Sequence, residues 1–547
     1  MVYHPQCWHF GVTSEDSAHL MKSAIRNATL LIILFSGPIL WIWIAIQGLT
    51  FLNWLLVGSI ILWGILLAVW YLCFGKAPFK KRGLRVGLGL IGAIALVFTA
   101  SSLLRYEGSS SGSSAPKFSW VWQNAESHGN TVKFQINTAD GPSTEELQKA
   151  SADLNQFFGP ARDATWSTPT FSSDWVSTPP QLVWRRSIGT GWSSFTVRGK
   201  KALTHEQNGD DECVTCLDLF TGETLWQHRD KGVRLVKDNL ENPAATMGGD
   251  GPRSTPTLHD GRAYALGSTG IVNCLDIETG KVIWTRNVIS EFDGRIHEWG
   301  LANAPLILPE YGTVVIPGSD RPGTTLVAFD LESGEDVWTY QGQGASYSSP
   351  RLLNFFDTTI LVCVNNKDAT GHDPATGEAL WTYPWPGDYP RVGQPLKVGE
   401  DRLLMSASYG MGTPLLELRK SGDQWSVKEI WKSTRLKTKF SSAALLEGYA
   451  YGLDEGRLAC IDLKTGDKVW KNQKFGFGQH LLFGDQLLVQ TEDGPVVCGQ
   501  IDPKGFTETG RIEDALSSMT WNAPAVAGRL LLIRNDKEAA CYLLPSL

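Results

Sequence analysis

Eight short polar stretches between residues 191 and 524 contain the side chains best suited to form a ligand site. Each places Ser, Asn or Gln in a similar context, as in Tyr-Ser-Ser-Pro (347–350) and Trp-Asn-Ala-Pro (521–524). Converging hydroxyl and amide groups can orient a ligand or a partner, but they can equally satisfy turn backbone and hold channel water. The recurring positions are Ser193, Ser254, Asn303, Ser348, Gln394, Ser442, Gln479 and Asn522, and the neighbouring side chains that could join them are Arg253, Trp299 and Tyr347.

Residues for catalysis or metal binding are sparse. The sequence contains no G-x-x-x-x-G-K-[ST], H-E-x-x-H or G-x-S-x-G motif. Glu298, beside Trp299, is the best candidate base and Arg253 a candidate anion clamp, although Glu298 could equally be solvated or paired on a loop. We expect the scattered histidines His297, His372 and His480 to lie on the surface or in turns. We therefore predict no catalytic, metal or cofactor site.

The cysteines form no disulfide or metal pattern. Cys213 and Cys216 make a lone C-x-x-C, and residues three apart on a strand face opposite sides. Cys216, Cys274 and Cys460 occupy the same slot of a repeat, two residues before an Asp. One residue type at one repeat position indicates a small buried side chain.

That repeat is Asp-x-x-(Thr/Ser)-Gly-x-x-x-Trp. It occurs as CLDLFTGETLW (216–226), CLDIETGKVIW (274–284), AFDLESGEDVW (328–338), GHDPATGEALW (371–381) and CIDLKTGDKVW (460–470). The Asp can accept hydrogen bonds from turn amides, and the Gly tolerates a positive φ. Each copy therefore predicts a hairpin whose Trp, on the return strand, covers the gap to a neighbouring sheet.

The spacing of the repeat predicts an eight-bladed β-propeller. The expected inter-blade tryptophans are Trp184, Trp226, Trp284, Trp338, Trp381, Trp431 and Trp470, which lie 39 to 58 residues apart, close to the length of a four-stranded blade. A degenerate copy ends at Trp431, and another opens at Asp502 and ends near Arg511 without a Trp. Residues 521–544 supply three strands, so the strand around Trp184 is expected to complete the last blade and close the ring.

Three apolar stretches precede the propeller and predict three transmembrane α-helices, at 28–46, 51–74 and 86–104. The loop 75–85 carries five positive charges and no negative charge, which places it in the cytoplasm. The predicted order is a cytoplasmic N-terminus (1–27), a three-helix anchor (28–104), a flexible linker (105–116), a small hairpin–helix segment (117–160) and the propeller (161–547). The propeller would then lie outside the cytoplasmic membrane, in the periplasm.

The charge distribution argues against a nucleic-acid partner. Residues 1–107 carry eight Lys or Arg and three Asp or Glu, a net charge of +5, so the total of −7 leaves −12 for the remainder. Phosphate contacts require clustered basic residues instead.

The repeated motif and the Ser-x-Pro stretches resemble the pyrroloquinoline quinone (PQQ)-like β-propeller family over residues 157–547. The resemblance implies two possible activities. One is that of the non-catalytic branch, which is similar to the lipoprotein that helps assemble outer-membrane barrels. The other is a periplasmic PQQ-dependent quinoprotein dehydrogenase, which would need Ca²⁺ and a stacking platform. The alcohol dehydrogenases of that branch also carry an adjacent Cys-Cys pair, which is absent here.

We therefore expect a membrane-anchored, extracytoplasmic, non-catalytic binding or scaffold module whose partner is another envelope protein. The dehydrogenase is the alternative. A sensor that signals through the helices is disfavoured because the predicted cytoplasmic part has only about 27 residues.

Overall fold

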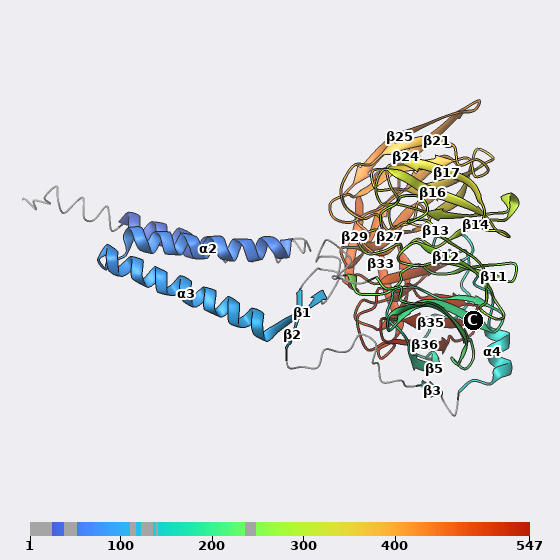
Figure 1. Cartoon of the computed structure of the whole chain (residues 1–547), viewed down its shortest axis with the longest axis horizontal. Coiled ribbons are helices and arrows are strands. Elements are labelled where there is room, and N and C mark those ends of the chain that lie inside the picture. The colour runs from blue at the N-terminus through green and yellow to red at the C-terminus, as the bar shows by residue number, and fades with distance from the viewer. Residues whose placement is uncertain (1–23, 38–51, 110–115, 122–134, 138–140, 236–247) are drawn as a thin grey trace, which may run out of the picture. The chain divides into compact units, whose positions relative to one another are not determined.

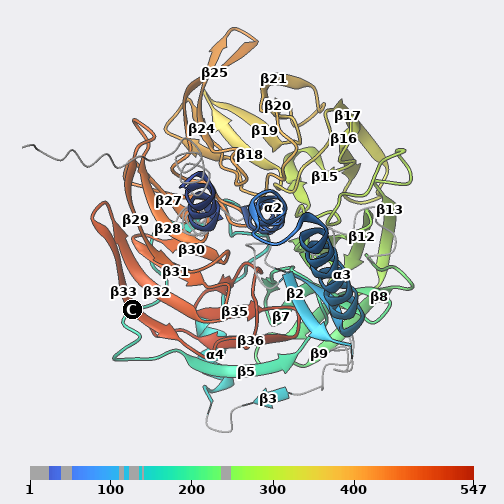
Figure 2. The same ribbon diagram turned by 90° about the vertical axis from the view of Figure 1, so that its left-hand side faces the viewer.

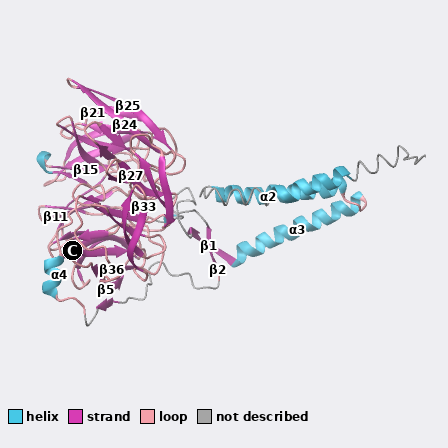
Figure 3. Ribbon diagram, turned by 180° about the vertical axis from the view of Figure 1, so that it is seen from behind, coloured by secondary structure: helices cyan, strands magenta, loops and turns pink. Residues whose placement is uncertain are grey.

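The structure is a computed structural model that describes residues 24–37, 52–109, 116–121, 135–137, 141–235 and 248–547 (Figure 1). Contacts divide the chain into two units, one formed mainly by residues 1–107 and the other mainly by residues 124–547. Figure 3 shows that one unit is mostly helical and the other mostly strand.

The helical unit contains a helix at Ala24–Gly37, α2 (Leu52–Phe74) and α3 (Phe79–Leu103). The first two are joined by side-chain hydrogen bonds, with Trp63 Nε1 donating to Ile33 O over 2.7 Å. Among the described residues, Phe79–Ala100 alone is long and apolar enough to cross a bilayer, while the apolar helical stretches Ala24–Gly37 and Ser59–Phe74 are shorter. Three transmembrane helices are therefore not shown, and residues 38–46 of the first predicted span and residue 51 of the second lie outside the described residues.

The boundaries around α3 differ from the sequence expectation. The helix begins at Phe79. Most of the segment 75–85, which was predicted to be a basic loop, therefore forms the first turns of this helix. The hairpin expected at the start of the segment 117–160 is not seen among the described strands. There β2 (Pro116–Trp120) pairs with β1 (Leu104–Ser109), and β3 (Gln135–Asn137) pairs with β5 (Gln181–Ser187). Residues 122–134, which contain the expected turn, lie outside the described residues. The centre of the predicted flexible linker, 110–115, lies outside the described residues.

Eight antiparallel sheets arranged around an axis confirm the eight-bladed propeller (Figure 2). We number the blades along the chain, and in each the first strand is innermost. Blades 1 to 4 comprise β6–β9 (Thr196–Arg198, Lys201–Asn208, Asp211–Asp218, Thr224–Asp230), β10–β13 (Thr257–His259, Arg262–Leu266, Ile271–Asp276, Val282–Asn287), β14–β17 (Leu306–Leu308, Thr313–Pro317, Gly323–Asp330, Asp336–Gly342) and β18–β21 (Arg351–Phe355, Thr358–Val364, Asp368–His372, Ala379–Pro384).

The remaining blades follow the same order. Blades 5 to 8 comprise β22–β25 (Leu396–Val398, Arg402–Leu404, Thr413–Ser421, Gln424–Ser433), β26–β29 (Ala444–Leu446, Tyr449–Asp454, Arg457–Asp462, Lys468–Lys474), β30–β33 (Gln479–Phe483, Gln486–Gln490, Val496–Asp502, Gly505–Ile512) and β34–β36 (Ala525–Ala527, Leu530–Arg534, Glu538–Leu543) completed by β5.

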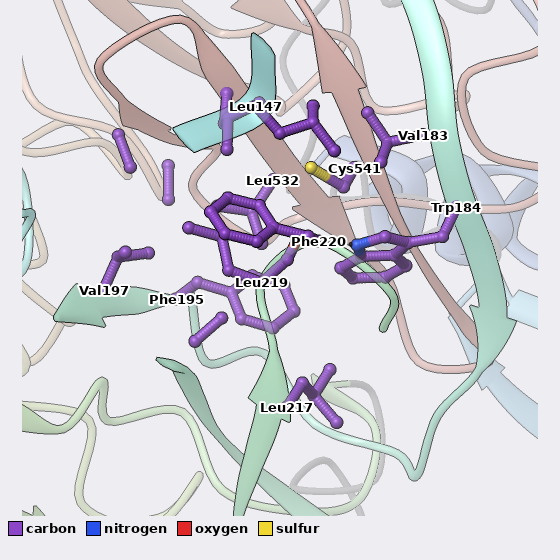
Figure 4. Close-up of a cluster of buried hydrophobic side chains, with 14 of the residues drawn as sticks. Leu147, Val183, Trp184, Phe195, Val197, Leu217, Leu219, Phe220, Leu532 and Cys541 are labelled. Atoms are coloured by element: carbon purple, nitrogen blue, oxygen red, sulfur yellow. Dashed lines mark hydrogen bonds between the residues drawn. The ribbon is translucent and has the colours of Figure 1, made fainter. Parts of the chain in front are cut away.

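The ring closes as predicted, through an N-terminal strand in the last blade. β5 pairs antiparallel with β36, with Trp184 opposite Cys541. Figure 4 shows Trp184 in one buried cluster with residues of blade 8, such as Cys541, and residues of blade 1, such as Leu219. The pairing removes the unpaired strand edge that an open array would expose.

Each repeated turn is hydrogen-bonded to the tryptophan of the preceding blade. Asp218 Oδ1 accepts from the amides of Phe220 and Thr221, both over 2.9 Å, and Trp184 Nε1 donates to Leu219 O of the same turn over 2.9 Å. The same indole-to-turn hydrogen bond is made by Trp226, Trp284, Trp338, Trp431 and Trp470. Each of these hydrogen bonds ties the tryptophan of one blade to the turn of the next.

Trp381 departs from this pattern for a local reason. Blade 5, which follows it, carries the degenerate copy, so β24 and β25 form a long hairpin in place of the repeated turn. Trp381 is buried, and its Nε1 finds no acceptor among the described residues. Its indole packs over Gly371 of its own blade instead.

The tryptophan missing from blade 7 is supplied by another part of the chain. Gly510 pairs with Cys498, the position that Trp takes opposite Cys216, Cys274 and Cys460 in other blades. Trp175 packs over this glycine, whose added Cβ would lie 2.4 Å from Trp175 Cβ. Its buried indole joins the hydrophobic cluster between blades 7 and 8.

One mouth of the central channel is closed by the segment 151–166, which we call the plug. It follows α4 (Thr144–Ala150), whose first turn is capped by Ser143, the side chain of which accepts from Glu146 N. The plug contacts innermost strands around the axis: Leu154 bridges Val197 of blade 1, and β4 (Thr165–Trp166) pairs in parallel with β30 of blade 7.

Candidate functional site

The eight predicted polar residues lie at the start of the blades and are all buried. With their neighbours they form a continuous hydrogen-bonded ring, because at each blade-to-blade junction a group of one blade bonds a group of the next. In blade order the bonds are Ser194 N to Thr255 Oγ1, Ser254 Oγ to Asn303 O, Asn303 Nδ2 to Ser348 O, Arg391 N to Ser346 Oγ, Gln394 N to Ser442 Oγ, Gln479 Nε2 to Phe440 O, Gln479 Nε2 to Trp521 O and Asn522 Nδ2 to Ser193 O.

These bonds give the polar ring a structural role. The donor groups of Asn303, Gln479 and Asn522 hold backbone carbonyls, which satisfies polar groups that would otherwise be buried unpaired. Their amide oxygens have no protein donor among the described residues, so these oxygens can hold channel water or meet a ligand. The sequence left open whether these side chains bind a ligand or satisfy the backbone. For the side-chain amide nitrogens, the geometry favours hydrogen bonds that join neighbouring blades.

Half-buried aromatic side chains surround the channel mouth opposite the plug. They come from the loops that lead into the innermost strands, and from the turn between the second and third strands of blade 5. We call this set the aromatic mouth: Trp192, Trp299, Tyr347, Tyr409, Phe440 and Trp521.

Contacts between distant blades show that these rings converge near the axis. Trp521 of blade 8 contacts Trp192 of blade 1 at a centroid distance of 4.9 Å, and Phe440 of blade 6 at 4.8 Å. The second contact passes over blade 7, which is possible only close to the axis. Trp299 and Tyr347 pair at 5.7 Å on the opposite side. Tyr389, half exposed, stacks on Tyr409 at 5.3 Å.

A buried lysine lies among these rings. Lys439 Nζ is 4.6 Å from the Tyr409 ring centroid, 4.8 Å from Phe477 and 5.5 Å from Phe440. Burial lowers the pKa of Lys439 to about 8, while Glu455 and Glu492 act in the opposite direction. The amine is therefore held by cation–π contacts at the inner wall of the mouth.

The other predicted members are brought to the same mouth, but Arg253 is not free to clamp an anion. Its guanidinium donates to the carbonyls of Gly248, Gly249 and Gly251, and its burial lowers its pKa to about 10. Trp192 Nε1 donates to the same Gly248 carbonyl over 2.7 Å. Arg253 and Trp192 thus shape one loop beside the mouth.

None of the three histidines lies on the surface. His297 lies in a loop, where its carbonyl accepts from Gly300 N, but the expectation of a surface or turn position was wrong for His372 and His480, which lie in strands β20 and β30. His297, His372 and His480 are buried, His297 Nε2 lies 2.9 Å from Gly318 O, and His372 Nε2 lies 2.7 Å from Thr370 Oγ1. Burial lowers the pKa of all three, to about 4 for His372 and His480. They are neutral parts of the strands and loops.

We expect the buried His480 to make the propeller less stable in acid. Its folded pKa of about 4 lies below the unfolded value of about 6.5, so the unfolded chain binds more protons between these pH values. Its contribution is complete above about pH 6.5 and is lost as the pH falls toward 4. Urea unfolding at pH 5 and pH 7 gives the change of the free energy of unfolding with pH. In His480→Gln this change should be smaller than in wild type by about 1 kcal/mol per pH unit. An unchanged pH dependence would contradict this assignment.

Sequence reasoning missed most of the aromatic mouth. Trp192, Phe440 and Trp521 lie within the polar stretches, but the hydroxyl and amide residues beside them were chosen. The available signal was an aromatic residue placed just before the recurring polar position, as in Trp192-Ser193, Tyr347-Ser348 and Trp521-Asn522. Lys439 had no such signal, because its ring partners come from three different blades.

The residues at the mouth do not fit a PQQ–Ca²⁺ centre. In the described part of the chain, no three His, Cys, Asp or Glu side chains gather in a metal-binding group. Arg253 is occupied by backbone carbonyls, and Glu492 accepts from Trp521 Nε1 and Phe477 N. We therefore derive no step through a quinone.

The comparisons with known proteins agree with the geometry. A family model described as outer membrane protein assembly factor BamB matches residues 210–472. The chain is 22% identical over 312 residues to that factor from Burkholderia pseudomallei, covering 55% of this chain and 75% of the relative. These matches support a PQQ-like β-propeller family. The chain is also 20% identical over 369 residues to BamB of Shewanella oneidensis, covering 64% of this chain and 81% of the relative.

Enzymes of the same fold are also similar to this chain. A quinohemoprotein alcohol dehydrogenase of Comamonas testosteroni is 26% identical over 170 residues, covering 29% of this chain and 22% of the enzyme. Its crystal structure aligns with a TM-score of 0.54 at 13% identity over 74% and 82% of the chains. A europium-containing methanol dehydrogenase aligns with a TM-score of 0.53 at 15% identity, covering 73% of this chain and 100% of the enzyme chain. At these identities the structures show a shared fold, and function depends on the site.

Proposed function

We propose that this PQQ-like propeller is a membrane-tethered, non-catalytic module of the cell envelope that binds another envelope protein through its aromatic mouth. The observation that carries the proposal is the convergence of half-buried Trp and Tyr side chains around one channel mouth while the plug closes the other. Such side chains are enriched at the energetic centres of protein interfaces. The relatives described as outer membrane protein assembly factors support a partner in that process.

The tether follows from the helical unit. α3 is apolar from Phe79 to Ala100, and exposed side chains such as Leu96 and Phe98 cover it. Exposed apolar helices of this length are typical of membrane spans. We propose that they anchor the chain in the inner membrane with the propeller in the periplasm, as the basic residues at the start of α3 favour a cytoplasmic location for that end.

We expect a photo-crosslinking amino acid at Tyr389 to capture a specific envelope protein in cells, because Tyr389 is half exposed and stacks on the mouth residue Tyr409. The matched control is the same amino acid at Val176, which is 82% exposed. Mass spectrometry should identify an outer-membrane assembly component at Tyr389 and none at Val176. Equal adducts at both positions, or no envelope protein at Tyr389, would contradict the proposed docking site.

Replacing the mouth aromatics should weaken the same complex. Trp299→Ala combined with Tyr389→Ala is expected to raise the dissociation constant of the captured partner at least about tenfold, which corresponds to about 1.4 kcal/mol. Biolayer interferometry with Val176→Ala as control measures this change. Cofactor absorbance retained after gel filtration with PQQ and Ca²⁺, together with dye reduction by alcohols, would instead favour the dehydrogenase.

A further inference from the structure

We propose that Arg162 of the plug and Arg351 of blade 4 form a binding site for one small monovalent anion, a halide or a small carboxylate, at the closed end of the channel. Both side chains are about 4% exposed and therefore lie out of bulk solvent. The site is separate from the aromatic mouth and does not depend on the function proposed for it.

The two guanidinium groups are fixed by backbone carbonyls. Arg162 Nη2 donates to Ala304 O over 2.8 Å and its Nη1 donates to Pro305 O over 3.0 Å. Arg351 Nη1 donates to Pro395 O over 2.5 Å, and its Nη2 donates to Ala161 O over 2.6 Å. These contacts hold the arginines in place but carry no net charge.

The charges in this cluster do not balance. The carboxylate paired with it is that of Asp163, whose Oδ2 lies 3.2 Å from Arg351 Nη2. Two guanidiniums and one carboxylate leave one excess positive charge in a poorly solvated place, where an unbalanced charge is costly. Burial first, and then repulsion from Arg351, lower the pKa of Arg162 to about 9. One monovalent anion would restore neutrality.

Each arginine also retains an unused hydrogen-bond donor. The Nε atoms of Arg162 and Arg351 are buried and have no acceptor among the described residues. Arginine has no acceptor of its own, so these N–H groups need an oxygen or an anion. Charge-assisted bonds from guanidinium to an anion are stronger than bonds to a neutral acceptor.

Arg162 lies in a strained part of the plug backbone. Phe158, Arg162 and Ala164 have φ angles of 61°, 55° and 60°, a region that non-glycine residues adopt only at a cost. Such strain persists where surrounding contacts over-determine it, and it is often found at ligand sites. An anion shared with Arg351 would add such a contact and fasten the plug to blade 4.

The first test is diffraction from crystals of the full-length chain soaked in bromide. We expect an anomalous peak within hydrogen-bonding distance of at least one of the two Nε atoms. A matched soak in acetate should show whether a carboxylate replaces the halide there. A peak at other sites without one at this pair would overturn the proposal.

The second test is thermal unfolding of the detergent-solubilised chain as chloride replaces gluconate, which is too large for an enclosed site, at constant ionic strength. Binding to the folded state should raise the melting temperature saturably. Arg162→Gln should abolish this chloride dependence. Arg534→Gln is the control, because Arg534 is also buried but its Nε donates to Asn535 O; it should lower the melting temperature but keep the dependence. Equal chloride dependence in Arg162→Gln and wild type would overturn the proposal.

Discussion

Replacing Trp184 by Ala is expected to lower the free energy of unfolding of the propeller by about 3–5 kcal/mol, the usual cost of emptying a buried aromatic site. Trp184 is fully buried at the junction of blades 8 and 1, and its Nε1 donates to Leu219 O. Because β5 is the strand that closes the ring, the substitution weakens the junction that joins the last blade to the first. Urea unfolding followed by tryptophan fluorescence measures the change.

The control for this prediction is Trp425→Ala. Trp425 lies on the long hairpin of blade 5, half-buried, where it contacts Phe356 at 6.0 Å. Trp425 is only partly buried against the hydrophobic cluster between blades 4 and 5. Its loss therefore empties no fully buried site, and we expect a change of about 1 kcal/mol or less. Equal destabilisation by the two substitutions would show that Trp184 has no special role in closure.

Replacing Gly334 by Ala is expected to destabilise the propeller by roughly 2–5 kcal/mol. Gly334 has a φ of +73°, and an added Cβ would lie 2.7 Å from Cδ2 of Trp284 in the preceding blade. Alanine therefore carries two costs, a left-handed backbone of about 1–2 kcal/mol and an overpacked indole of about 1–3 kcal/mol. Differential scanning calorimetry or urea unfolding would measure their sum.

Gly422→Ala separates these two costs. Gly422 has a φ of +60° in the hairpin turn of blade 5, but no atom lies within 4 Å of its added Cβ. We expect this variant to show the backbone cost alone, about 1–2 kcal/mol. If Gly422→Ala proves as damaging as Gly334→Ala, the contact between turn glycine and indole is not what constrains the repeat.

The repeat could be predicted from sequence because its information is local. Asp218, Gly222 and Trp226 lie within one hairpin, and each has a conformational or packing preference that survives in a short segment. The cysteines at the strand position opposite the tryptophan follow the same logic: Cys216, Cys274 and Cys460 are buried as expected. Fold class, blade number and the closing strand all followed from counting such units.

The helical segment was harder to predict because composition does not set helix boundaries. The apolar stretches were found, but a basic sequence was assigned to a loop although α3 begins at Phe79. Lys and Arg are good helix formers, so a run of them does not end a helix. Within the part of the helical unit that the structure describes, one helix is long and apolar enough to be a candidate span, where composition suggested three.

The sequence by itself determined the repeating unit of this protein, its number and the way in which the ring closes, since those depend on residues a few positions apart. The tertiary structure alone decided what fills the gap between blades 7 and 8 and what occupies the two ends of the channel. Trp175 replaces the indole missing at Gly510, Arg162 and Arg351 meet across 189 positions, and Trp192, Phe440 and Trp521 converge near the axis. The physical reason is that closing a ring brings together side chains whose separation along the chain carries no periodic signal, so only the folded geometry makes them neighbours.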